Sequence, residues 1–185
     1  MARACHDATR GVVANDNVAL EDSAVKITSV LFVCMGNICR SPTAEAVMRH
    51  KLQQAGLHGL VMVDSAGTHA WHAGSPPDHR SMQHAARRGY DLSALRAREV
   101  VEADFERFDL ILAMDWDNLA LLEERCPDAR RRKLGRLTEF CRRHESPVVP
   151  DPYAGGAQGF EEVLDGMEDA CDGLLERISR QTPAR

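Results

Sequence analysis

Short apolar runs alternate with stretches of helical spacing or loop composition along most of the chain. Buried strands are predicted at the continuous aliphatic runs: 30–33, 60–63 and 108–114, with a fourth at Leu134 that exits through 137–140. A strand, a helix and a second strand in that order call for a parallel sheet with a right-handed crossover. The predicted fold class is therefore an α/β three-layer domain, with a central four-stranded parallel sheet flanked by helices.

Helical periodicity fills several intervals between these runs. Helices are predicted over four segments: from Thr43 to about Gly56, from Ser81 to Arg88 before Gly89, from Asn118 to Arg125 with Asp115 as N-cap, and from Phe160 toward the C-terminus. In the last segment, positions 160, 163, 164, 167, 171, 174, 175 and 178 are apolar. Their spacing places one apolar stripe along the helix, and we expect that stripe to pack on the sheet.

Composition and charge narrow the kind of protein. The 185 residues are 44% hydrophobic and 28% charged, as in an ordinary globular protein with one sizeable core. The net charge of −5 argues against a general affinity for nucleic acid, and no apolar run is long enough for membrane insertion. Six cysteines at irregular positions do not suggest a disulfide framework, so we expect a cytoplasmic protein.

The first residues differ in character from the rest of the chain. Residues 1–26 show neither helical nor strand periodicity and lack the apolar segment of a secretory signal. They are predicted to be a mobile N-terminal tail. Residues 27–185 are predicted to form the functional domain.

The candidate chemistry lies between the first predicted strand and the first predicted helix. Residues 34–42 there read Cys-Met-Gly-Asn-Ile-Cys-Arg-Ser-Pro, and the final proline suits the first turn of a helix. Successive backbone N–H groups of such a turn, together with the helix dipole, favour a tetrahedral oxyanion. Gly36 permits close approach of that ligand, and Arg40 supplies a planar fork of donors. The same surroundings favour the thiolate of Cys34, to which Ser41 can donate its hydroxyl.

Three other interpretations compete at Cys34. A cysteine at the end of an apolar strand is commonly a small buried side chain. Cys34 and Cys39 have a spacing found in zinc sites, but no second pair follows at a suitable spacing and Arg40 would repel a metal ion. A nucleotide P-loop requires Gly-x4-Gly-Lys-Ser/Thr, which the run lacks. The combination of residue types in this order favours an anion-binding loop that holds a nucleophile.

The run resembles the Cys-x5-Arg-Ser-Pro loop of the low-molecular-weight protein tyrosine phosphatase family, and residues 91–98 resemble its bacterial branch. The resemblance implies that Cys34 is the nucleophile, that Arg40 holds the phosphoryl group and that Ser41 eases departure of the sulfur. The implied phosphate-binding residues are those of the loop: Met35, Gly36, Asn37, Ile38, Cys39 and Arg40. The domain over 27–185 would then be a phosphatase domain.

A second motif resembles the same family. Asp151-Pro152-Tyr153 is similar to its general-acid loop, which implies that Asp151 protonates the leaving tyrosyl oxygen and then activates water. Tyr153 is implied as one aromatic wall of the cleft. Trp71 is implied as another, with anchoring of its own loop as the alternative. Three nearby histidines lack metal-ligand spacing and are interpreted as solvated: His69, His72 and His79.

Two positions depart from the family pattern. Leu95 stands where the bacterial branch often has a histidine that braces the loop's Asn and Ser. Asn37 is therefore expected to be satisfied by backbone groups or water, because a buried amide without partners is costly. Ala154 stands where many members have a second tyrosine, which narrows the hydrophobic rim.

The resemblance implies a two-step phosphoryl transfer through a phosphocysteine, with no metal or other cofactor. Because Asp151 must be protonated while Cys34 is ionised, a bell-shaped rate profile centred below neutral pH is expected. Cys39 has two open interpretations, a reversible disulfide with Cys34 under peroxide or a small buried side chain.

The predicted function is hydrolysis of phosphotyrosine in proteins. The implied partner is a phosphotyrosine protein, with an autophosphorylating bacterial tyrosine kinase as a candidate. One alternative is a thioredoxin-coupled arsenate reductase, which needs two further cysteines on a mobile segment, whereas Cys126 and Cys141 do not form a close pair. The other is a non-catalytic phosphoprotein-binding module, which has no need of Cys34 as nucleophile or of Asp151 as acid.

Overall fold

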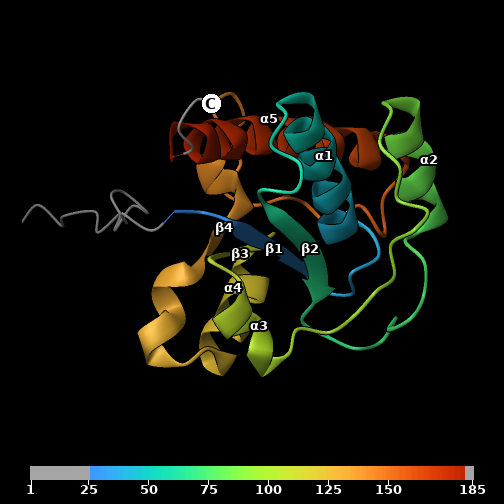
Figure 1. Cartoon of the computed structure of the whole chain (residues 1–185). Helices are drawn as coiled ribbons and strands as arrows, with labels where there is room; N and C mark the ends of the chain where they lie inside the picture. Colours follow the sequence, from blue (N-terminus) through green and yellow to red (C-terminus); the bar gives the residue numbers. More distant parts are fainter. Residues whose placement is uncertain (1–25, 182–185) are drawn as a thin grey trace, which may run out of the picture.

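A computed structural model describes residues 26–181 of the chain. Four parallel strands form one sheet in the order β2-β1-β3-β4 (Figure 1). The strands are β1 (Ser29–Cys34), β2 (Met62–Gly67), β3 (Leu110–Ala113) and β4 (Leu134–Arg136). The predicted fold class is confirmed. All of the predicted N-terminal tail except Lys26 lies outside the described residues.

Helices cover both faces of the sheet and so give the domain its three layers (Figure 1). On one face lie α1, α2 and α5, and on the other lie α3 and α4. The α-helices are α1 (Arg40–Gln54), α2 (His79–Arg87), α3 (Glu102–Arg107), α4 (Trp116–Arg125) and α5 (Ala157–Gln181). Two short 3₁₀ segments flank β4, namely η1 (Asp128–Lys133) and η2 (Leu137–Phe140).

The central strand β1 is buried along its whole length. Val30 and Phe32 belong to the cluster under α1 and α5, whereas Leu31 and Val33 belong to the cluster under α3 and α4. Successive side chains of a strand point to opposite faces of the sheet. A strand covered on both faces therefore needs apolar residues at consecutive positions, and this is why the first run shows no alternation.

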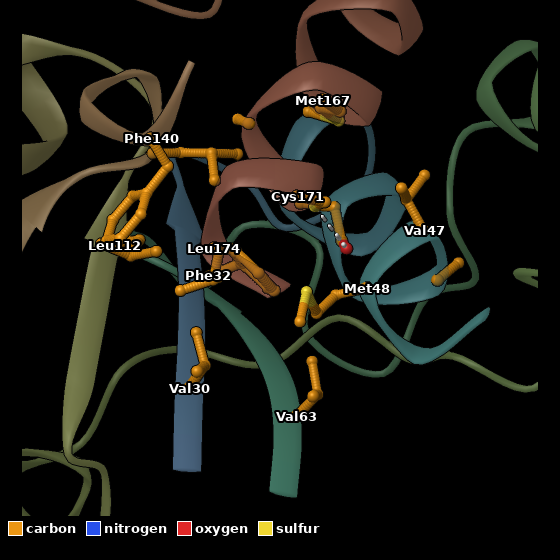
Figure 2. Packing of buried hydrophobic residues seen from close by; sticks show 14 of the residues in the cluster. Val30, Phe32, Val47, Met48, Val63, Leu112, Phe140, Met167, Cys171 and Leu174 are labelled. Atoms are coloured by element: carbon orange, nitrogen blue, oxygen red, sulfur yellow. Dashed lines mark hydrogen bonds between the residues drawn. The ribbon is translucent and has the colours of Figure 1, made fainter. Parts of the chain in front are cut away.

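The larger cluster fills the space between the sheet, α1 and α5. Figure 2 shows Phe32 of β1, Leu112 of β3, Met48 of α1 and Leu174 of α5 gathered there. The apolar stripe predicted on α5 is confirmed, because seven of its eight positions are buried and Leu175 is packed against the cluster. Each fully buried side chain of this size contributes roughly 1.5–3 kcal/mol of transfer free energy. The stripe thus holds the C-terminal helix on the sheet.

The predicted second strand was wrong in its position. It was expected at 60–63, but β2 begins at Met62, whose N–H donates to Thr28 O at 2.8 Å. Leu60 precedes the strand and is 45% exposed. Residues 64–67, expected to follow the strand, instead continue it. Pairing with β1 determines the register, and the apolar run alone does not contain that information.

Other boundaries also differ from the prediction, and α1, α4 and α5 each begin two or three residues earlier than expected, at Arg40, Trp116 and Ala157. The third strand was expected over 108–114 and is confined to the four residues of β3. The second helix was expected from Ser81 but begins at His79, because the side chain of Asp78 accepts a hydrogen bond from Arg80 N at 2.8 Å and caps it. An aspartate at this position satisfies one of the unpaired N–H groups of the first turn.

The order of the strands places a crevice at the carboxyl ends of β1 and β3. These strands are neighbours, but the chain continues from β1 outward to β2 and from β3 outward to β4. In open α/β sheets, ligands bind outside the carboxyl edge where the strand order reverses in this way. Cys34 is the last residue of β1, and Asp115 follows β3 closely. The topology therefore brings both residues to one binding edge.

A close approach joins α5 to η2. A Cβ atom built on Gly173 would overlap the carbonyl oxygen of Phe140, whereas one built on Gly166 of the same helix would meet no atom within 4 Å. The missing side chain at Gly173 allows the two segments to pack.

Replacing Gly173 with alanine is expected to lower the free energy of unfolding by about 1–3 kcal/mol, because the added methyl group must displace backbone. Gly166→Ala is the matched control, and its better helix propensity is expected to raise stability by up to about 1 kcal/mol. Urea unfolding of both variants measures the difference. Equal effects of the two substitutions would contradict a packing role for Gly173.

Candidate active site

A tight loop of residues 35–39, here called the β1–α1 loop, connects Cys34 with the first residue of α1. The carbonyls of Cys34 and Met35 accept hydrogen bonds from the N–H groups of Thr68 and His69, at 2.8 and 3.1 Å. These carbonyls are therefore engaged by the neighbouring segment. A Cβ atom on Gly67 would lie 2.6 Å from Met35 O, so the loop approaches the end of β2 too closely for any larger residue.

Asn37 holds the centre of the β1–α1 loop. Its backbone is left-handed, with φ of 54°, a conformation that asparagine tolerates better than most residues. Its side chain is buried, and Nδ2 donates to Ser41 Oγ and to Ser65 Oγ, both at 2.9 Å. Its Oδ1 accepts from Arg98 N at 2.9 Å. The expectation that backbone or water would satisfy this amide was thus right for Oδ1 and wrong for Nδ2.

The hydroxyl that takes one Asn37 donor is itself held by a buried carboxyl group. Ser65 Oγ donates to Glu45 Oε2 at 2.5 Å, and Glu45 is only 2% exposed. Burial raises the pKa of Glu45, while the Ser65 hydrogen bond and the charge of Arg49 act in the opposite direction. The side chain at Leu95, where the family's bacterial branch often has a polar partner, is packed against the apolar core. Sequence reasoning did not identify Ser65 or Glu45 as part of the site.

The sulfur of Cys34 lies 3.0 Å from Ser41 Oγ. Ser41 is fully buried and also donates to Ala66 O at 3.1 Å, while it accepts from Asn37. Three neighbours thus determine the position of this hydroxyl. The hydroxyl carries one proton, so it can stabilise negative charge on the sulfur only when that proton turns from Ala66 O toward Sγ, while the oxygen itself stays in place.

Arg40 is almost completely buried at 2% exposure, and it contacts two carboxylates. Nη1 lies 2.6 Å from Asp115 Oδ2 and 3.3 Å from Val149 O, and Nη2 lies 2.7 Å from Asp151 Oδ2. Burial acts to lower the pKa of Arg40, but the negative charge of Cys34 and of the two carboxylates outweighs it and raises the pKa above its usual value. The guanidinium is therefore a permanent cation beside Cys34.

Asp115 has two roles in the structure. Its Oδ1 accepts from Asn118 N at 2.7 Å, which confirms the predicted N-cap of α4. Its other oxygen pairs with Arg40, a contact that the sequence analysis missed. The position of Asp115 after a strand that neighbours β1 was the available signal, because the ends of such strands meet at one edge.

The loop of residues 148–153 carries Asp151 to the site. Val149 N donates to Met114 O at 2.8 Å, which ties the loop to the end of β3. Tyr153 N donates to Asp151 Oδ1 at 3.0 Å, a local turn that orients the carboxylate. The side chain of Asp151 is 46% exposed. It therefore reaches both Arg40 and the solvent.

One pocket of about 190 Å³ brings most of the predicted residues together. It is lined by Cys34, Met35, Gly36, Ile38, Cys39, Arg40, Trp71, His72, Asp151 and Tyr153. Asn37 and Ser41 are buried behind this lining. Cys39 is also buried, and desolvation raises the pKa of its thiol to about 12.

The aromatic residues stand at the rim of the pocket. Trp71 is 67% exposed and Tyr153 is 54% exposed. Trp71 lines the pocket and also stacks on His69, with ring centroids 4.2 Å apart, a contact within its own loop. His79 is solvated as predicted, but His72 is partly buried and lines the pocket, against the interpretation given to it.

Two other features are absent from the part of the chain that the structure describes. Among residues 26–181, no group of three or more His, Cys, Asp or Glu side chains is placed to hold a metal ion. Within the same part of the chain, no helix has the length and apolarity needed to cross a bilayer.

Comparison with known proteins agrees with this geometry. The family model for low molecular weight phosphotyrosine protein phosphatase matches residues 29–184. A putative low molecular weight protein-tyrosine-phosphatase of Synechocystis is 43% identical over 153 residues, which cover 82% of this chain and 97% of that protein. The Bacillus subtilis protein-tyrosine-phosphatase YfkJ is 39% identical and covers 83% of this chain and 97% of its own.

Similarity extends to the three-dimensional structure. A crystal structure of a protein tyrosine phosphatase from Entamoeba histolytica, with Hepes in the active site, superposes with a TM-score of 0.81. It is 43% identical and covers 83% of this chain and 97% of its own. Sequence, fold and site geometry thus agree, and the chain belongs to the low molecular weight phosphotyrosine protein phosphatase family.

Proposed function

We propose that this protein hydrolyses phosphotyrosine in proteins, with Cys34 as nucleophile and Asp151 as general acid and base. The observation that carries the proposal is the meeting of three groups in one pocket: the Cys34 sulfur, the buried Arg40 guanidinium and the half-exposed Asp151 carboxylate. Their joint presence matches the needs of phosphoryl transfer, namely a nucleophile, a fixed positive charge and a proton source.

In the first step, Cys34 Sγ attacks phosphorus in line with the aryl oxygen. Arg40 and the N–H groups of the β1–α1 loop hold the three equatorial oxygens, where the transition state spreads its charge. In this structure Arg40 Nη2 donates to Asp151 Oδ2 at 2.7 Å, and when the substrate binds, a phosphoryl oxygen replaces Asp151 as the acceptor of that hydrogen bond. As the P–O bond breaks, its electron pair goes to the aryl oxygen, which receives the proton of Asp151. The products are a phosphocysteine and a free phenol.

The second step returns the enzyme to its starting state. The Asp151 carboxylate takes a proton from water, and the water oxygen attacks phosphorus as the P–S bond breaks. The electron pair of that bond returns to Cys34 as thiolate. Ser41 Oγ, 3.0 Å from the sulfur, stabilises the leaving charge. Inorganic phosphate is released.

The pocket walls fit a flat aromatic ester. Trp71 and Tyr153 line the rim on two loops far apart in the sequence, and an aromatic ring between them has faces or edges to contact. We assign the substrate-binding roles to these two side chains. His72 also lines the pocket and lies beside the β1–α1 loop, since a Cβ atom built on Gly36 would be 2.9 Å from the His72 ring.

The setting of the reaction is part of the same proposal. The homologues act, by their names, on phosphotyrosine proteins, so we assign a phosphoprotein partner, with a bacterial tyrosine kinase as the candidate. The net charge of −5 argues against nucleic acid as a partner. A thiolate nucleophile requires a reducing compartment, so we assign the protein to the cytoplasm. We take residues 27–185 as the catalytic domain.

The arrangement of the other cysteines does not favour arsenate reduction. Cys126 lies in the cluster under α3 and α4, whereas Cys141 packs against the cluster under α1 and α5, on the opposite face of the sheet. A thiol relay through both would require them to come together across the core. A non-catalytic phosphoprotein-binding module would need neither the nucleophile Cys34 nor the acid Asp151 in its pocket.

Replacing Cys34 with serine is expected to lower the rate of p-nitrophenyl phosphate hydrolysis by at least about 10³-fold, because an alcohol is a far weaker nucleophile at this position. The assay is run in chelator, so that no metal contributes. Cys141→Ser, on a half-buried cysteine outside the pocket, is the control and is expected to keep full activity. Retained turnover in Cys34→Ser would contradict the phosphocysteine pathway.

Replacing Asp151 with asparagine is expected to slow phenyl phosphate by about 10²- to 10³-fold, and to slow p-nitrophenyl phosphate less. The reason is that p-nitrophenolate is a better leaving group and needs its proton less. The substitution is also expected to remove the fall in rate at higher pH, because that limb of the pH–rate profile reports deprotonation of the general acid. Asp115→Asn is the matched control, because Asp115 also pairs with Arg40, at 2.6 Å.

The control should affect both esters by the same factor, since Asp115 donates no proton in the proposed pathway. If Asp151→Asn also slowed both esters equally, its role would be to orient Arg40 and the general-acid assignment would be wrong.

We further propose a reversible disulfide between Cys34 and Cys39, which line the same pocket. Peroxide oxidises Cys34 to a sulfenic acid, and the Cys39 sulfur then displaces water to form the S–S bond. Since the pKa of Cys39 is raised to about 12, its thiolate fraction grows with pH, and closure should accelerate from pH 6.5 toward 8.5. Mass spectrometry after mild peroxide detects the bond. With Cys39→Ser, Cys34 is expected to proceed to sulfinic acid, and absence of the bond in the unmodified chain would contradict the proposal.

A further inference from the structure

Arg80, in the first turn of α2, is held by a bidentate ion pair. Its Nε donates to Asp78 Oδ1 at 3.0 Å and its Nη2 donates to Asp78 Oδ2 at 2.9 Å. The carboxylate also caps α2, and the hydrogen bonds from Arg80 lower the pKa of Asp78 below its ordinary range. Asp78 therefore remains ionised at neutral pH. A pair of this geometry fixes the plane of the guanidinium as well as its position.

The same aspartate connects Arg80 to the floor of the pocket. Asp78 N donates to Ile38 O at 2.8 Å, and Ile38 belongs to the β1–α1 loop. The guanidinium is thus placed relative to the loop that binds the phosphoryl group. Arg80 itself is not among the described residues that line the pocket.

The opposite side of the guanidinium reaches the exposed wall of the pocket. Nη1 donates to Tyr153 O at 3.1 Å, and the guanidinium carbon lies 5.4 Å from the centre of the Tyr153 ring. It also lies 4.9 Å from the centre of the Phe160 ring, which is buried at the start of α5. The distances allow cation–π attraction to both rings. Arg80 therefore connects the exposed Tyr153 ring with the buried Phe160 ring and, through Asp78, with the β1–α1 loop.

We propose that Arg80 is the positioning residue that holds Tyr153 as a wall of the pocket, and that it thereby sets the preference for phosphate esters of flat aromatic rings. This inference rests on the proposed function and names the group that gives it substrate selectivity. An exposed ring on a loop loses conformational freedom when it contacts a ligand. If Arg80 already holds the Tyr153 ring, less conformational entropy is lost when the ligand binds.

The two parts of the ligand contact different parts of the site. The phosphoryl group binds the β1–α1 loop and Arg40, whereas the ring of the ester contacts Tyr153. Loss of Arg80 is therefore expected to weaken binding of a ring and to leave binding of a bare phosphate unchanged. A general structural role would affect both ligands alike.

The test compares inhibition constants of inorganic phosphate and phenylphosphonate against p-nitrophenyl phosphate hydrolysis. In Arg80→Ala the constant for phenylphosphonate is expected to rise about five- to tenfold, the size of a lost cation–π contact plus loop ordering, while that for phosphate stays within about twofold. Arg80→Lys keeps the charge without the planar fork and is expected to lie between the two. The control is Arg87→Ala, an exposed arginine on the same helix, expected to change neither constant.

A double substitution makes the test specific to Tyr153. In a Tyr153→Ala background, Arg80→Ala is expected to add no further loss for phenylphosphonate, because the wall that it positions is gone. Parallel changes of both inhibition constants, no change in either, or an additive loss in the double variant would overturn the inference. If Arg80→Ala did not fold, Arg80→Lys would decide by the same ratio of constants. Failure of the unmodified chain to hydrolyse p-nitrophenyl phosphate would instead overturn the proposed function.

Discussion

The arrangement of the site depends on the burial of one guanidinium. Arg40 is 2% exposed, and a buried cation without partners would cost several kcal/mol. Asp115 and Asp151 supply the compensating carboxylates, from the end of β3 and from the 148–153 loop. One side chain on α1 thereby determines the relative positions of three segments. The charge that is expensive to bury is also the charge that phosphoryl transfer requires, so stability and chemistry place the same demand on these residues.

The floor and the walls of the pocket are built differently. The floor is made of the β1–α1 loop, with Asn37 and Ser41 buried in hydrogen bonds behind it. It stands on β1, which is covered by helices on both faces (Figure 1). Trp71 and Tyr153 are exposed on loops and hold their positions through a few contacts with neighbours. In our proposals the chemistry belongs to the rigid floor, and selection of the ester belongs to the walls.

The departure at Leu95 shows how the interior adjusts to a lost polar partner. Leu95 joins the apolar cluster, and the Asn37 amide is satisfied by Ser41, Ser65 and the backbone of Arg98. Ser65 in turn donates to the buried Glu45. A buried network of this kind is stabilising only when every member has a partner. The Asn37 amide therefore has partners for both of its polar atoms although Leu95 supplies none.

Much of the fold and the centre of the site follow from the sequence, because they depend on neighbouring residues. The spacing of apolar positions predicted the sheet and the stripe on α5, and the order of residues from Cys34 to Ser41 predicted an anion-binding loop with a nucleophile. Local geometry determines such features, since a strand, a turn and a helix start are all short-range structures. The roles of Asp115 toward Arg40, of Glu45 toward Ser65 and of His72 at the pocket were not predictable in this way. Arg40 and Asp115 are 75 positions apart, and Arg40 and Asp151 are 111 apart. Only strand pairing and loop packing bring such residues within hydrogen-bond distance, because side-chain contacts over these separations depend on the tertiary structure and leave no periodic signal in the chain.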